Sequence, residues 1–240
     1  GMQNYNQVSM QIVRALRGHL TQESVSRNLG KRSNKVAKWE SGEHKIYWAD
    51  FVALAELCDA PLAASLATHL SYRGKPLAAN RLMQKLCSSF EHKEVASWLR
   101  CSSSSLSRWV SGEIDPPLAI VLSLIDKLGR LQGFVKTVAG ELEILQDIND
   151  AHRNIMHVFH RFPEAALILC AMDLKSYTQL ERFQPGYFAD RLDITLEREE
   201  EVLQSLMDVG LLSFTKEKYQ TQVVHTNTTY TDRESFDITK

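Results

Sequence analysis

A segment of 24 residues occurs twice in this chain, and this repeat constrains the fold more than any other feature. Residues 20–43 align without gaps on residues 90–113, at an offset of 70. Seven of the 24 positions are identical, and they include a tryptophan and the glycine three residues after it. Self-similarity at a fixed spacing indicates a repeated structural unit. We therefore expect two copies of one small domain.

Each copy has the pattern of two short helices joined by a tight turn. In the first copy, Thr21 can cap a helix whose apolar residues, four apart, lie on one face. Gly30 would end this helix, Ser33 or a neighbour would cap the second one, and Gly42 would close it. A further amphipathic helix would follow until Pro61 breaks it. The pattern predicts three helices around one small core.

From Thr21 onward, the first copy has the pattern T-Q-E-x-x-x-x-x-L-G-x-x-x-x-x-V-x-K-W-E-S-G-E. This pattern resembles the DNA-binding domain of the phage lambda repressor and Cro (XRE-type) regulators. The resemblance covers about residues 8–66 and, more weakly, residues 77–128. It implies a five-helix bundle whose third helix enters the major groove of double-stranded DNA, while the N-terminus of the second helix meets phosphate.

Carried over position by position, the resemblance implies that Gln22 contacts the DNA backbone and that Trp39 is mainly a core anchor. The exposed residues of the recognition helix would be Ser33, Asn34, Lys35 and Lys38. Their chemistry agrees, because Asn can read adenine edges, Lys can donate to guanine, and Ser can donate to bases or phosphate. Arg32 and Lys31 would add charge near the DNA backbone. The alternative is a polar helix face that only meets solvent.

The second copy departs from the family pattern. Arg100 stands where the first copy has its helix-ending glycine, and a run of serines opens the would-be recognition helix. The candidate DNA-binding residues of this copy are His92, Ser103, Ser104, Ser105 and Arg108. Two interpretations stay open: a second DNA-reading domain, or a degenerate domain kept for packing or dimerisation.

Charge is spread unevenly along the chain, whose net charge is only -1. Residues 1–50 hold 8 basic and 4 acidic side chains, whereas residues 118–240 hold 13 basic and 19 acidic ones. Residues 51–117 are close to balance, with 7 and 6. Because phosphate neutralisation depends on local charge, this distribution suits a polyanion-binding N-terminal part on an acidic body.

The second half is predicted to be helical and to end in a small α+β domain. Apolar stripes over residues 118–162, interrupted by three glycines, indicate helices buried against the same chain, with a dimer interface as the alternative. Beyond them we expect helices around residues 165–174 and 187–192, and a third helix capped by Thr195. Two short strands would follow, Leu211 to Phe214 and Tyr219 to Val224.

The stretch R-L-D-I-T-L-E-R-E-E-E-V-L-Q-S-L-M-D-V-G-L-L resembles the winged helix of multiple-antibiotic-resistance-type regulators. Its would-be recognition helix begins with Glu197, Glu199, Glu200 and Glu201, which DNA phosphates repel. We therefore expect an oligomerisation or partner-binding module, where a protein or small-molecule effector would bind. The expected domains are residues 2–72 and 76–128 for the two helix-turn-helix domains, 129–162 for a helical connector, 163–224 for the winged-helix-like domain, and 225–240 for a loosely ordered tail.

Other classes of site find no support in the sequence. No apolar run approaches the ~20 residues of a membrane-spanning helix, and the four cysteines lack a C-x-x-C pair. His157 and His160 lie three apart, but no carboxylate cluster or H-E-x-x-H motif completes a metal site. No glycine-rich phosphate loop, nucleophile elbow or Cys/His nucleophile motif suggests catalysis. We expect no metal, no cofactor and no enzymatic activity.

These features predict a mainly all-α, cytoplasmic protein that binds double-stranded DNA sequence-specifically and regulates transcription. Its fold would be two tandem lambda-repressor-like helix-turn-helix bundles, a helical connector and a small winged-helix-like domain. A homodimer would supply paired DNA-binding domains, or the tandem copies of one chain would supply both half-sites. The second hypothesis is a protein-interaction or signal-sensing adaptor built on the same folds. RNA binding is less favoured, because no aromatic-bearing sheet is predicted.

Overall fold

The computed structural model describes residues 2–222, a mainly helical chain with fifteen helices and one two-stranded sheet in that range. The chain divides into two compact units, with the boundary between Leu145 and Gln146 near the start of α11. No helix in the described part is long and apolar enough to cross a membrane.

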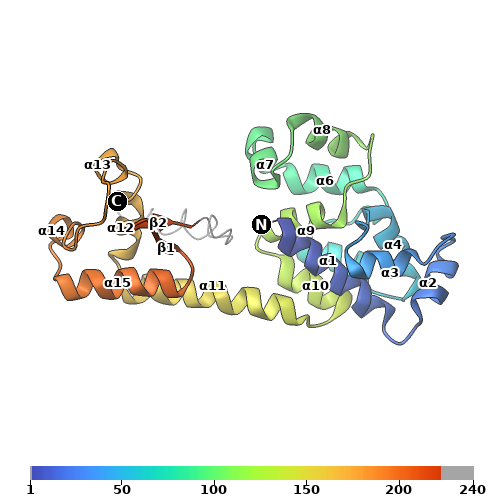
Figure 1. Cartoon of the computed structure of the whole chain (residues 1–240). Coiled ribbons are helices and arrows are strands. Elements are labelled where there is room, and N and C mark those ends of the chain that lie inside the picture. Colours follow the sequence, from blue (N-terminus) through green and yellow to red (C-terminus); the bar gives the residue numbers. More distant parts are fainter. Residues whose placement is uncertain (1, 223–240) are drawn as a thin grey trace. The chain divides into compact units, whose positions relative to one another are not determined.

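The first unit consists of two successive sets of five helices (Figure 1). The first set is α1 (Met2–Arg17), α2 (Gln22–Asn28), α3 (Lys35–Ser41), α4 (Trp48–Leu57) and α5 (Leu62–Leu70). The second set is α6 (Ala79–Cys87), α7 (His92–Leu99), α8 (Ser103–Ser111), α9 (Leu118–Lys127) and α10 (Leu131–Ala139). Both ends of α9 lie 70 residues after the corresponding ends of α4, so the structural repeat extends beyond the repeated segment of sequence.

The repeat fixes which side chains enter the core. At positions 70 residues apart, both side chains are at most 9% exposed in the pairs Val25/Val95, Val36/Leu106, Trp39/Trp109, Trp48/Leu118, Phe51/Val121 and Leu54/Leu124. The buried positions of α2 and α3 recur at three- and four-residue spacing, which places them on one helix face. The predicted burial of Trp39, which is 1% exposed, is confirmed.

Where the second copy lacks the glycine, the backbone keeps the same path. Gly30 has a φ of 72°, and Arg100 at the equivalent position has a φ of 51°. A left-handed conformation costs a residue with a Cβ roughly 1–2 kcal/mol. The second set tolerates this strain because the amide of the following residue bonds back into the helix in both copies, from Lys31 to Ser26 and from Cys101 to Ala96.

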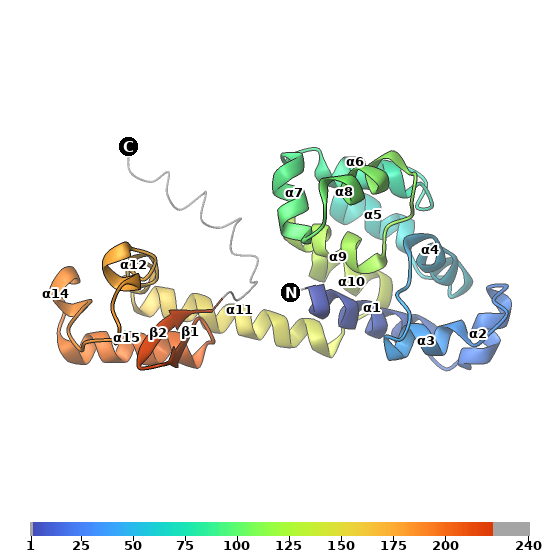
Figure 2. The same cartoon turned by 45° about the horizontal axis from the view of Figure 1, so that its top comes forward.

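The two sets pack against each other within the first unit. Tyr47 and Pro117 form an antiparallel bridge, and α5 lies against α10. Figure 2 shows α10 among the helices of this unit, although it falls in the segment 129–162 that we expected to be a connector. Phe134 and Val135 of α10 are fully buried, which accounts for its place in this core rather than in a connector.

A carboxylate of the second set caps a helix of the first. Asp115 Oδ2 accepts a hydrogen bond of 2.8 Å from the amide of Ala49, in the first turn of α4, whose own N-cap residue makes no side-chain bond. Burial raises the pKa of Asp115, and the nearby charge of Asp50 raises it further. The charged form is therefore held in the folded chain at some cost in stability.

Asp115→Asn and Asp115→Ala should separate the effect of the capping hydrogen bond on stability from the effect of the negative charge. A raised folded pKa favours folding below the unfolded pKa, and this advantage is lost as the pH rises through the folded pKa. Asn keeps the acceptor without the charge, so we expect its unfolding free energy at pH 7 to equal or exceed that of the wild type, with the difference vanishing in acid. Ala should lose about 1 kcal/mol. Urea denaturation at pH 7 and pH 4 measures both, and an Asn variant as weak as Ala would contradict the assignment.

The second unit combines short helices with a β-hairpin. Its elements are α11 (Glu143–Arg161), α12 (Ala165–Ala171), α13 (Lys175–Thr178), α14 (Ala189–Leu192), α15 (Leu196–Asp208), β1 (Leu212–Thr215) and β2 (Lys218–Thr221). Thr195 caps α15, as predicted, by accepting from the amide of Arg198 at 3.1 Å. Lys216 and Glu217 both have positive φ, the geometry of a type I′ hairpin turn. The predicted strand residues 223–224 and the tail 225–240 lie outside the described residues.

The acidic start of α15 differs from our expectation in one residue. Glu199 is 2% exposed, and its carboxylate accepts hydrogen bonds of 2.7 Å from the amides of Gly186, Phe188 and Ala189. It therefore belongs to the core and not to an acidic surface. The expectation of an acidic surface was wrong for this residue, because three consecutive glutamates do not indicate which side chain is buried. Glu197, Glu200 and Glu201 are exposed, as expected.

Glu199→Gln should destabilise the second unit while Glu200→Gln should not. The amide keeps one acceptor but removes the charge that three backbone donors stabilise, at a cost of about 2–3 kcal/mol. An exposed substitution should stay within about 0.5 kcal/mol. All four tryptophans lie in residues 39–109, so tryptophan fluorescence reports only the first unit and far-UV circular dichroism reports both. A Glu199→Gln transition that is unchanged by circular dichroism would refute the role.

Candidate nucleic-acid interface

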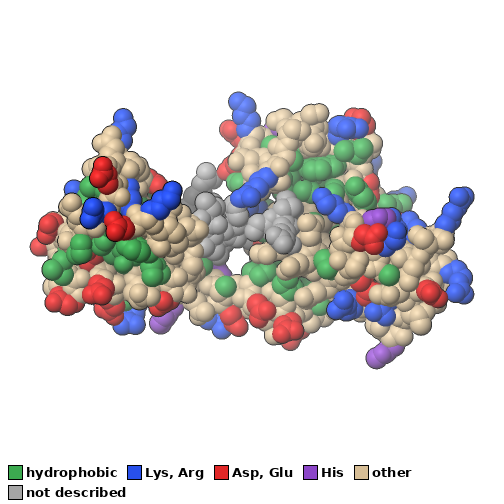
Figure 3. Space-filling view, in the orientation of Figure 1, with side chains coloured by type: hydrophobic (Ala, Val, Ile, Leu, Met, Phe, Trp, Pro, Cys, Tyr) green, Lys and Arg blue, Asp and Glu red, His purple; other side chains and the backbone are tan. Residues whose placement is uncertain are grey.

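Helices α2 and α3 pack together and expose the segment between them. Thr21 caps α2 by accepting from the amide of Ser24 at 3.1 Å, as predicted. The buried Val36 and Trp39 hold α3 to the core. Arg32 and Ser33 precede α3, are exposed, and make no side-chain hydrogen bond or ion pair within residues 2–222. In Figure 3, Lys and Arg side chains gather over the α2–α3 end of this unit.

Asn34 is the residue that caps α3. Its Oδ1 accepts from the amide of Ala37 at 3.3 Å and from the hydroxyl of Ser26 at 3.2 Å. The same hydroxyl accepts from the amide of Val36 at 3.0 Å, so a buried Ser ties the two helices together. Reading adenine with two hydrogen bonds requires both the oxygen and the nitrogen of the Asn amide. With its oxygen engaged in the cap, Asn34 has only the amide nitrogen to offer to a base.

The two lysines of α3 reach toward the turn that follows the helix. Lys35 Nζ lies 2.7 Å from His44 Nδ1, and Lys38 Nζ lies 3.4 Å from a carboxylate oxygen of Glu43. The side chains of Lys38 and Glu43 are 38% and 60% exposed. Such an exposed pair contributes at most about 1 kcal/mol, so a phosphate or base can compete for the lysine. Sequence reasoning missed both partners, although they directly follow Gly42.

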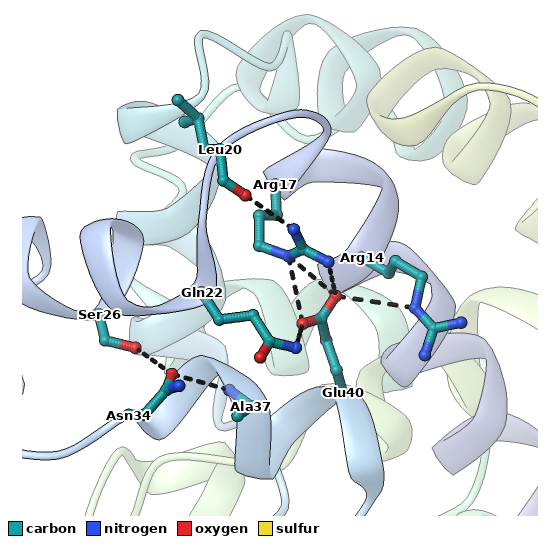
Figure 4. Close-up of polar contacts among 8 residues, drawn as sticks. All are labelled: Arg14, Arg17, Leu20, Gln22, Ser26, Asn34, Ala37 and Glu40. Atoms are coloured by element: carbon teal, nitrogen blue, oxygen red, sulfur yellow. Dashed lines mark hydrogen bonds and ion pairs between the residues drawn. The ribbon is translucent and has the colours of Figure 1, made fainter.

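Gln22 belongs to a buried polar cluster centred on Glu40 (Figure 4). Glu40 is 3% exposed, and Arg17 approaches its carboxylate at 3.0–3.2 Å. Gln22 Nε2 donates to the same carboxylate, and Arg14 lies 3.7 Å from it. This cluster joins α1, α2 and α3, and it holds the Gln22 side chain at the first residue of α2. The predicted contact between Gln22 and the DNA backbone depends on this position of the side chain.

Glu40→Gln should destabilise the first unit far more than Lys38→Ala. Removing the charge of Glu40 leaves Arg17 without its buried counter-ion, which costs about 3 kcal/mol, whereas the exposed Lys38 pair should change stability by less than about 0.5 kcal/mol. Urea denaturation followed by tryptophan fluorescence measures both. Equal midpoints for the two variants would show that the cluster is not a structural tie.

Helices α7 and α8 repeat this arrangement with shorter side chains. Ser102 caps α8 by accepting from the amide of Ser105 at 3.1 Å, so α8 starts two residues earlier than its counterpart α3. Ser103 and Ser104 are exposed in the first turn, and Ser105 is half-buried. His92 Nε2 lies 3.1 Å from the carbonyl of Ser103, linking the starts of the two helices.

The turn after the second helix is the same in both sets. Gly42 and Gly112 have φ near 80°, and each amide bonds to the carbonyl of the tryptophan three residues earlier at 3.3 Å. Arg108 pairs with Glu113 at 3.0 Å, the counterpart of the pair between Lys38 and Glu43. One exposed cation per set is thus held at an equivalent position beside a carboxylate.

The buried polar cluster is confined to the first set. At the positions of Arg17, Gln22 and Glu40, the second set has Cys87, His92 and Val110. Burial raises the pKa of Cys87 to about 11, so this thiol is uncharged at neutral pH. The second set thus has a thiol and an aliphatic side chain at the positions of Arg17 and Glu40, so it does not bury this pair of charges.

The remaining candidate chemistry is not brought together. Among the described residues, no group of three or more His, Cys, Asp and Glu side chains is placed to hold a metal ion, and all four cysteines are unbridged. Comparisons of the chain with protein-family models, with curated proteins and with solved structures find no match. The functional interpretation therefore depends on the residues and their geometry.

Proposed function

We propose that the chain is a sequence-specific, double-stranded DNA-binding transcription regulator in which α2–α3 and α7–α8 are helix-turn-helix pairs. The observation that carries the proposal is the repeated exposure of a cation on the second helix of each pair, Lys38 and Arg108, directly before a buried tryptophan. A helix anchored on one face with cations on the other is what a major groove accepts.

The residues around α3 supply the contacts that such a complex needs. Arg32 and Ser33 are exposed donors for phosphate or bases, and Lys35 and Lys38 can donate to guanine O6 and N7. The glutamate and histidine beside the lysines are weak competitors, because both lie at the surface. A regulator must share a compartment with its DNA, so we propose a cytoplasmic location.

For the second unit we propose a winged-helix-like module that binds a partner or effector instead of DNA. Glu197 and Glu200 are exposed near the start of α15, where they would repel phosphates. Large apolar side chains are also at least half exposed here, as Figure 3 illustrates for one face. They are Leu167, Leu174, Leu196 and Phe214. These residues also favour the second candidate function, a protein-interaction adaptor.

Fluorescence anisotropy should separate the two functions. With duplexes enriched by random-sequence selection, we expect wild-type binding that weakens steeply with salt. Lys35→Ala/Lys38→Ala should lower the affinity at least tenfold and flatten the salt dependence, because base and phosphate contacts are each lost. Lys136→Ala/Lys175→Ala removes the same charge from helices outside the two helix pairs and should bind like the wild type.

Glu43→Gln is a control that should raise the DNA affinity, whereas Lys35→Ala/Lys38→Ala should lower it. It releases Lys38 without removing a cation, so the affinity should rise by up to about fivefold, the equivalent of an exposed ion pair. If selection finds no preferred sequence and all these proteins bind DNA equally weakly, the regulator is ruled out and the adaptor function gains support.

A further inference from the structure

We propose that one chain binds DNA through both helix pairs at once, as a covalently linked pseudo-dimer that reads two dissimilar half-sites. This inference rests on the proposed DNA-binding function and deepens it. Of the two arrangements that the sequence left open, it selects the tandem copies of one chain over the homodimer, with both sets of helices in the first unit.

The contact between the two sets is reciprocal. The amide of Trp48 donates to the carbonyl of Pro116 at 2.9 Å, and the amide of Leu118 donates to the carbonyl of Ile46 at 2.9 Å. Trp48 and Leu118 are equivalent positions of the repeat, 70 residues apart, and so are Ile46 and Pro116. The bridged residues Tyr47 and Pro117 are likewise equivalent. Contacts in which residue i meets j′ and i′ meets j define a two-fold axis in a homodimer. Here they define a local two-fold axis inside one chain.

The last helices of the sets extend the same interface. α5 packs on α10, its counterpart, and each helix has a fully buried apolar side chain, Leu66 on α5 and Phe134 on α10. Ser65 Oγ donates to the carbonyl of Phe134 at 2.9 Å, and both groups are buried. Equivalent helices that pack on each other lie across a two-fold axis, as the bridge also requires.

Contacts without a symmetric counterpart lock the pair. α1 is longer than α6, and its additional N-terminal turns pack on α9, where Tyr5 donates to Asp126 at 2.6 Å. Trp48 Nε1 donates to the carbonyl of Pro76 at 2.6 Å, between the two sets. These bonds and the shared core make the first unit one compact body. The two helix pairs therefore keep a fixed mutual orientation, which flexibly linked domains would not have.

A two-fold arrangement of reading helices matches the two-fold symmetry of the DNA backbone. Two such helices meet half-sites about 10–10.5 base pairs apart. In this chain the two helices differ, because α3 presents Lys35 and Lys38 whereas α8 presents Ser103, Ser104 and Arg108. The bound sequence should therefore have two different halves, with the first half read through lysines. No association of chains precedes binding, so the second helix pair binds at a high effective concentration.

The test begins with random-sequence selection on the full chain and the stoichiometry of the selected complex. We expect a site with two unlike halves about one helical turn apart, bound by one chain per duplex in light scattering after gel filtration. Inserting 5 base pairs between the halves turns one half to the opposite side of the duplex, and it should lower the affinity at least tenfold.

Equivalent substitutions then assign each half. Lys38→Ala should erase the sequence preference in one half and Arg108→Ala in the other, each with about a tenfold loss of affinity, which corresponds to one lost base contact. Lys136→Ala should change neither half. Circular dichroism of each variant establishes that it is folded.

Three results would overturn the inference. A palindromic site bound by two chains would restore the homodimer, and selective binding insensitive to Arg108→Ala and to the insertion would leave only the first set as a reader. Both outcomes keep the proposed DNA-binding function intact. Absence of any selective, salt-sensitive binding by the wild type would remove the function and the inference together.

Discussion

The reciprocal backbone hydrogen bonds between residues 46–48 and 116–118 are the constraint on which the first unit depends. They join the segments that lead into α4 and α9, the central helices of the two sets. Because backbone groups make these two bonds, this part of the junction does not depend on particular side chains. The cap that Asp115 places on α4 adds a side-chain bond across the same contact. The positions of α3 and α8 follow from this junction.

The sequence predicted several helix ends in both units because their signals are local. Thr21 and Thr195 cap helices at the expected positions, and the glycines that close α3 and α8 have the left-handed conformation that such ends require. It did not predict the contact between α5 and α10. An apolar stripe shows that a helix is buried but not which helix covers it. The place of α10 in the first unit depends on its contact with α5.

At the candidate site, the sequence predicted the exposed segment between α2 and α3 but not the hydrogen bonds and ion pairs of its side chains. Asn34 and Ser33 have similar helix-capping preferences, and only the hydroxyl of Ser26 on the neighbouring helix selects Asn34. Glu40 and Glu199 look like surface residues in sequence, yet each is buried with hydrogen-bond partners 10 to 23 residues away. Such pairings arise from packing between elements, which neither spacing nor composition encodes.

The two sets share a framework and differ in what they expose. In the first, the buried carboxylate of Glu40 needs Arg17 and Gln22 around it, so three helices are tied at one point. In the second, Cys87 and Val110 stand at the positions of Arg17 and Glu40, so this ion pair has no counterpart. Both arrangements, with the ion pair and without it, keep the tryptophan and the glycine turn in place. The exposed residues of α8 can therefore differ from those of α3. A duplicated framework of this kind lets one chain combine a lysine-bearing and a serine-bearing surface about a single local axis.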